Sequence, residues 1–144
     1  MSTDYIDTDD ATQRLRGDFG SLYDLPDDAV DLADDITAAE STVNAYVGRR
    51  YAVPVTNAVA VAFIKVVTLD IFEELAWSRG AGDELPARVT SRADRARKQL
   101  RDIADGIITL GGATAAAEQS SGGADAIVVD GNAPQFNRDH MEGF

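Results

Sequence analysis

The chain of 144 residues contains no cysteine, one histidine and only two lysines. Without cysteine there is no disulfide bond, no thiolate metal site and no cysteine nucleophile, so the fold must be stabilised by packing. The single histidine, His140, lies near the C-terminal end and has no predictable catalytic partner. We interpret it as an exposed or interface residue, and no catalytic residue is nominated.

Long hydrophobic runs are also scarce. The longest, residues 58–72, is interrupted by Lys65 and Asp70 and falls short of the roughly 20 residues that cross a membrane. No signal peptide is recognisable at the start, and we expect no membrane association. The aspartates lack the Ca²⁺-loop pattern, and the glycine pairs lack the spacing of a phosphate-binding loop. From the sequence we therefore expect that the protein binds no metal ion and no cofactor and is not an enzyme.

Positive charge is in short supply. The 25 acidic and 13 basic residues give a net charge of −12, which disfavours binding to phosphate backbones. Aspartate supplies 19 of the acids and arginine 11 of the bases, a bias compatible with adaptation to high salt or with a GC-rich genome. Residues 1–48 hold 12 acids and 2 bases, whereas residues 49–110 hold 8 and 10. The surface is therefore expected to be polarised.

Two helices are predicted in the acidic first third. A short one begins at an N-cap signal at residues 8–10 and ends at Gly17 and Gly20. A longer one follows Pro26, carries Asp31 in its first turn and ends at Gly48. Its predicted buried stripe comprises Ala29, Leu32, Ala33, Ile36, Ala39, Val43, Tyr46 and Val47. The acids between these positions, Asp31, Asp34, Asp35 and Glu40, are expected to be exposed.

Two further helices are predicted after a tight linker at residues 49–55. The third, at about residues 57–78, is apolar on nearly all sides and should lie at the centre. The fourth follows Pro86, and its predicted stripe is Val89, Ala93, Ala96, Leu100, Ile103 and Ile107. Its other faces carry Arg88, Arg92, Arg95, Arg97, Lys98 and Arg101. This basic surface either pairs with nearby carboxylates or contacts an acidic neighbour, such as an adjacent copy.

The fold class indicated is all-α, a small bundle of about four helices with an extended, partly β-like C-terminal tail. We expect a helical domain at residues 1–110, a flexible Gly/Ser/Ala-rich linker at 111–125 and an extended docking segment at 126–144. The docking segment includes the strand-like run at 126–129 and ends in large side chains.

The residues from Asp34 to Pro54, an Ala-rich helix followed by Arg49-Arg50-Tyr51-Ala52-Val53-Pro54, resemble the head-tail connector (adaptor, or head-completion) proteins of tailed viruses and prophages. The likeness continues through residues 70–75, the Arg-rich helix and residues 108–111. It includes the ending at residues 136–144, which is similar to a Phe-x-Arg-Asp-x-Met-x-Gly-Phe ending in that group.

The resemblance implies a structural virion protein at the neck, assembled in the host cytoplasm as a ring, usually a dodecamer, beneath the portal protein after DNA packaging. DNA would pass through the ring without specific binding. Phe136, Arg138, Met141 and Phe144 are the candidate docking residues for the portal or for a tail or stopper protein. Arg88, Arg92 and Arg95 against Asp31 and Asp35 are the candidate contact between subunits. The alternative is a soluble acidic helical module that sequesters a basic protein.

Overall fold

The computed structural model describes residues 4–80 and 84–116. The chain divides into two units, Met1–Thr114 and Ala115–Phe144. In the part of the first unit that is described, the order is α1 (Thr8–Leu15), a 3₁₀ turn η1 (Arg16–Asp18), α2 (Phe19–Leu22), α3 (Ala29–Val47), α4 (Ala58–Gly80) and α5 (Ala87–Ala104). The predicted all-α bundle is confirmed for these residues.

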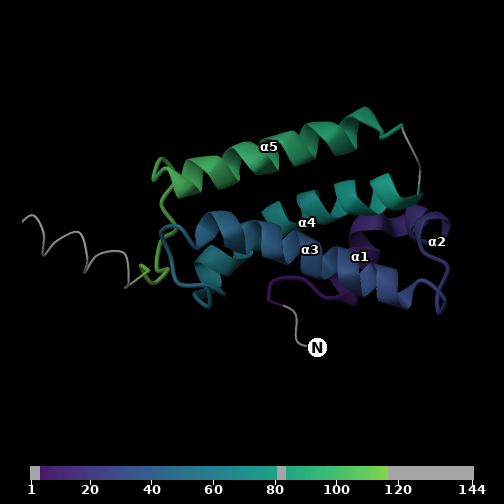
Figure 1. Ribbon diagram of the computed structural model, residues 1–144, viewed down its shortest axis with the longest axis horizontal. Coiled ribbons are helices and arrows are strands. Elements are labelled where there is room, and N and C mark those ends of the chain that lie inside the picture. The colour runs from purple at the N-terminus through teal and green to yellow at the C-terminus, as the bar shows by residue number, and fades with distance from the viewer. Residues whose placement is uncertain (1–3, 81–83, 117–144) are drawn as a thin grey trace, which may run out of the picture. The chain divides into compact units, whose positions relative to one another are not determined.

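Helix α4 is the central element of this unit (Figure 1). It packs against α5, α3, α1 and α2, as expected for a helix that is apolar on most sides. Phe72 and Ile64 on α4 are fully buried, as are Leu100 and Ile103 on α5 and Tyr23 after α2. The core therefore lies on both sides of α4 and joins all the helices.

Both ends of the first short helix differ from the prediction. The N-cap is Asp7, which precedes the predicted signal at residues 8–10, and its side chain accepts a hydrogen bond from the backbone N–H of Asp10. After α1, Gly17 and Gly20 do not stop helical structure, because η1 and α2 contain them. Packing of Leu22 against the core holds this segment in helical turns.

Helix α3 has the predicted bounds, but part of its predicted exposure is wrong. Ala29 and Ala33 are exposed, whereas Asp35 and Glu40 are only 5% and 7% exposed. Both acids are buried because tertiary partners satisfy them. Arg79 and the Tyr23 hydroxyl donate to Asp35, while Glu40 accepts from two backbone N–H groups near the N-terminus.

The predicted stripe of the fourth helix is confirmed through Ile103 and wrong at Ile107. Helix α5 ends at Ala104, and the chain turns at Gly106 with a φ of +80°, a conformation that glycine adopts easily. Ile107 is consequently 73% exposed. Residues 111–114, the beginning of the predicted linker, belong to the first unit, and Ala113 packs against the core. The rest of the predicted linker beyond residue 116 and the strand-like run lie outside the described residues.

Candidate interaction groove

One face of α4 changes character along its length. Val59, Phe63, Val66, Asp70 and Glu73 follow each other at spacings of four and three residues, so they lie in one stripe along the helix. The first half of the stripe is apolar and open, since Val59 and Val66 are 74% and 52% exposed. The second half carries two carboxylates that are almost completely buried, Asp70 at 2% and Glu73 at 3% exposure.

Arginines from two other elements surround these carboxylates. Arg14 on α1 bridges both, because it donates to Asp70 and also, from Nε, to Oε2 of Glu73 at 2.9 Å. From α5, Nη1 of Arg92 lies 3.3 Å from Oε2 of Glu73, and Nη2 of Arg95 lies 3.7 Å from Oδ2 of Asp70. Each buried acid thus faces two arginines, which balance the cost of removing its charge from water.

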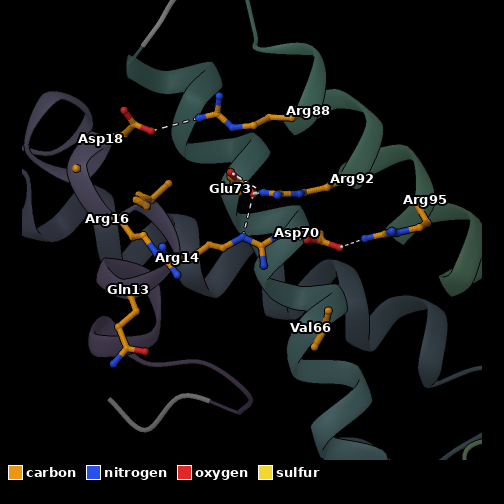
Figure 2. Close-up of a pocket in the computed structure, with 12 residues that line it drawn as sticks. Gln13, Arg14, Arg16, Asp18, Val66, Asp70, Glu73, Arg88, Arg92 and Arg95 are labelled. Atoms are coloured by element: carbon orange, nitrogen blue, oxygen red, sulfur yellow. Dashed lines mark hydrogen bonds and ion pairs between the residues drawn. The ribbon is translucent and has the colours of Figure 1, made fainter.

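The same side chains line a groove between the α1–η1 segment and α5, with α4 as its floor (Figure 2). Its volume is about 540 Å³. The lining residues are Gln13, Arg14, Leu15, Arg16, Gly17, Asp18, Val66, Asp70, Glu73, Arg88, Arg92 and Arg95. Five of them are arginines and three are acids, so the groove is positive although the chain is strongly acidic.

Two of the groove arginines, Arg88 and Arg16, make no ion pair with the buried acids Asp70 and Glu73. Arg88 pairs with the partly exposed Asp18 at 3.3 Å and lies with its guanidinium 5.8 Å from the centre of the Trp77 ring. Arg16 ends α1 with a φ of +49°, an uncommon value for a residue other than glycine. Within residues 4–80 and 84–116, its side chain makes no ion pair.

The structure brings the predicted contact residues Arg88, Arg92 and Arg95 together on one wall of the groove (Figure 2). Their pairing with carboxylates of the same chain is the first of the two interpretations given for the basic helix. Asp31 and Asp35 lie elsewhere, at Arg79: the Arg79 guanidinium is 3.3 Å from Asp31 and 2.7 Å from Asp35.

Asp35 is a structural residue within its own subunit. Its Oδ2 accepts a 2.6 Å hydrogen bond from the Tyr23 hydroxyl. Burial, together with this hydrogen bond to a carboxylate, raises the pKa of Tyr23, and the bond to Asp35 likewise raises the pKa of Arg79. A carboxylate with these partners has little left to offer a neighbouring molecule, and Asp31 is the more accessible of the two.

Phe136, Arg138, Met141 and Phe144 lie outside the described residues, and their docking role stays a prediction.

Comparison with known proteins identifies the family. The family described as "Bacteriophage Mu, Gp36" matches residues 5–129, most of the chain. The chain belongs to the bacteriophage Mu Gp36 family. It is therefore a phage protein, in agreement with the viral part of the predicted resemblance. No curated protein and no solved structure matches this Gp36-family chain.

Residues 4–80 and 84–116 contain neither of two further features, a membrane-spanning helix and a metal-binding cluster. No helix there is long and apolar enough to cross a membrane. No group of three or more histidine, cysteine, aspartate or glutamate side chains in those ranges is arranged to hold a metal ion.

The carboxylate half of the groove was not predicted from the sequence, nor were Arg14 and Arg16, the two arginines that the α1–η1 segment contributes. A signal was present, because Asp70 and Glu73 are three residues apart in the most apolar helix. Such acids need cationic partners, and Arg92 and Arg95 repeat the same three-residue spacing on the next helix. The contribution of α1 carried no comparable signal.

Proposed function

We propose that this Gp36-family protein is a non-enzymatic head-tail connector. It assembles as a ring beneath the portal after DNA packaging and links the capsid to the tail. The observation that carries the proposal is that one small helical unit has two different surfaces of opposite charge. One is the groove described above, named the arginine groove for its five arginines. The other is the acidic start of α3, residues 25–34. A head-to-tail ring requires two different, complementary patches on each subunit. Membership of a phage family and the resemblance to connector proteins support the same role.

The net charge supports passage of DNA rather than its capture. A ring of subunits that each carry a charge of −12 repels phosphate backbones and releases few counterions on contact with them. The groove arginines do not reverse this net charge, because Asp18, Asp70 and Glu73 lie among them. DNA therefore slides through the lumen without specific binding.

The groove carboxylates serve structure rather than catalysis in this proposal. General acid–base chemistry needs a group that can exchange a proton with a substrate. Asp70 and Glu73 are instead buried and each held by two arginines from different elements. The C-terminal residues Phe136, Arg138, Met141 and Phe144 complete the connector by docking on the portal or on a tail or stopper protein.

The test is deletion of the gene from an inducible prophage or phage genome that encodes the chain, with the intact gene supplied in trans as the control. We expect lysates with DNA-filled heads and separate tails, and joined particles again when the gene is supplied. Reconstruction of the complemented particles by electron microscopy should show this helical unit as a ring at the neck. Normal joining without the gene, or a chain found only in complex with a basic non-virion protein, would contradict the connector role.

A further inference from the structure

The arginine groove retains unused binding capacity. The side chains of Arg88, Arg92 and Arg95 are 54%, 43% and 64% exposed, and their ion pairs to the groove acids are long, at 3.3 to 3.7 Å. A guanidinium has five N–H donors in a planar fork, so donors remain directed to solvent. Arg16 adds a charge with no ion-pair partner in the described part of the chain.

The groove also offers an apolar contact. Val66, half exposed, lines its floor on α4, as Figure 2 shows. Gly17 lines the groove on the α1–η1 side, opposite α5. No other heavy atom lies within 4 Å of the position that a Cβ would occupy on Gly17, so there is open space beside it. The ligand indicated by these residues has an apolar side chain flanked by carboxylates.

The start of α3 has that composition. Leu25 and Val30 are large apolar residues exposed to 45% and 70%. Asp27, in the turn before α3, and Asp34 are exposed acids with no ion pair in the described residues. Asp27, Val30 and Asp34 follow each other at spacings of three and four residues, which favours a position on one side of this segment.

We propose that the arginine groove of one subunit receives the acidic start of α3, residues 25–34, of a second copy. Val30 packs against Val66, and Asp27 and Asp34 pair with Arg16 and Arg95. Asp31 and Asp35 hold the start of α3 against Arg79 of its own subunit, so this surface is already shaped before contact. The contact joins two different patches, as a ring or an open chain of subunits requires. The inference rests on the proposed ring and names the surfaces that build it.

Disulfide trapping tests the contact directly, because the chain has no cysteine of its own. Two single variants, Val30→Cys and Val66→Cys, are mixed, one of them isotopically labelled, and oxidised. A head-to-tail contact is expected to give heterodimers well in excess of random pairing, and the excess should fall in high salt as the charge pairs are screened. Random pairing, or a preference for homodimers, would overturn the proposal.

Charge exchange provides the second measurement. The groove variant Arg16→Glu/Val66→Glu leaves the ion pairs of the buried acids intact, whereas reversal of Arg92 and Arg95 would strip partners from Glu73 and Asp70 and risk unfolding. The acidic-end variant is Asp27→Lys/Val30→Lys, which changes the two positions that face Arg16 and Val66 in the proposed contact and leaves Asp34 opposite Arg95. We expect each variant alone to self-associate at least tenfold more weakly than the wild-type chain by analytical ultracentrifugation. An equimolar mixture should regain association, because each altered patch then meets a partner of opposite charge.

The matched control is Arg101→Glu/Val59→Glu, which makes the same chemical changes at exposed positions of α5 and α4 outside the groove lining. It should associate as the wild-type chain does, and circular dichroism should show the same helix content for all variants. Association of the groove variant at wild-type strength, or a mixture that fails to recover, would contradict the contact. If these tests fail while the chain is found as a ring at the particle neck, the surfaces are wrong and the connector role stands.

Discussion

Asp70 and Glu73 are two buried acids on the most apolar helix, and burial of a carboxylate costs free energy. Arg14 offsets much of that cost, because it pairs with both side chains. It reaches both carboxylates from α1, so it links three elements: α1 directly to α4, and α5 through the arginines that share the same acids. Removal of one partner of a buried ion pair is more damaging than loss of a surface pair, because the remaining charge stays in a poorly solvated place.

Replacement of Arg14 by alanine should therefore lower the free energy of unfolding by about 3 kcal/mol. The matched variant Arg88→Ala breaks a pair with Asp18 in which both side chains are about half exposed, and it should cost less than about 1 kcal/mol. Urea denaturation followed by circular dichroism measures both. Equal losses for the two variants would show that Asp70 and Glu73 do not depend on Arg14.

Tyr23 gives a prediction with a definite direction in pH. The variant Tyr23→Phe removes the donor to Asp35 and should lower the free energy of unfolding by about 2 kcal/mol at neutral pH. Because burial raises the pKa of Tyr23 in the folded chain, the folded state keeps this proton above about pH 10, where the unfolded chain loses it.

The contribution of the folded-state proton is complete below pH 10 and declines as the pH rises further. In urea titrations, the difference in free energy of unfolding between the wild-type chain and Tyr23→Phe should therefore stay constant up to about pH 9 and narrow as the pH rises from about 10 toward 11. Tyr5, whose pKa is also raised, is present in both proteins and cancels. A difference that stays constant with pH would mean that the Tyr23 hydroxyl is not held as described.

At the scale of the elements, side chains of α3 hold the N-terminal arm, residues 4–7 before α1, in place. Oε1 of Glu40 accepts hydrogen bonds from the backbone N–H groups of Tyr5 and Ile6, at 2.7 and 3.0 Å. The Tyr5 hydroxyl donates to Asn44 and accepts from the N–H of Val55. The arm thus connects α3 to the end of the segment that leads into α4, and side-chain hydrogen bonds rather than backbone pairing hold it there.

We expect Glu40→Ala to accelerate amide hydrogen exchange at Tyr5 and Ile6 and to lower the free energy of unfolding by about 2 kcal/mol, because two buried donors lose their acceptor. Ser41→Ala, at an exposed position beside Glu40 on the same helix, is the control and should change stability by less than about 0.5 kcal/mol. Exchange measured by NMR separates the two. Unchanged protection at Tyr5 in the Glu40 variant would contradict this account of the arm.

At the scale of the whole molecule, the connector proposal assigns separate tasks to the helical unit and to the C-terminal residues. Deletion of residues 134–144 should leave the helix content and thermal midpoint unchanged, since the core described here is built from residues 5–110. The truncated protein should nevertheless fail to complete particles in the complementation assay. Normal completion by the truncated chain would remove Phe136, Arg138, Met141 and Phe144 from the docking role and leave the ring contact untouched.

The sequence by itself determined the helices. Apolar spacing located α3, α4 and α5 to within a few residues, and the continuous apolar character of α4 correctly placed it at the centre, because periodicity and capping are local properties. Only the tertiary structure decided which charged side chains are buried. Four acids, Asp35, Glu40, Asp70 and Glu73, are buried because partners distant in the sequence pair with them. Hydropathy predicts that an acidic side chain is exposed to solvent, and it contains no information on those partners. The arginine groove likewise depends on α1 and α5 meeting over α4, which no single helix specifies.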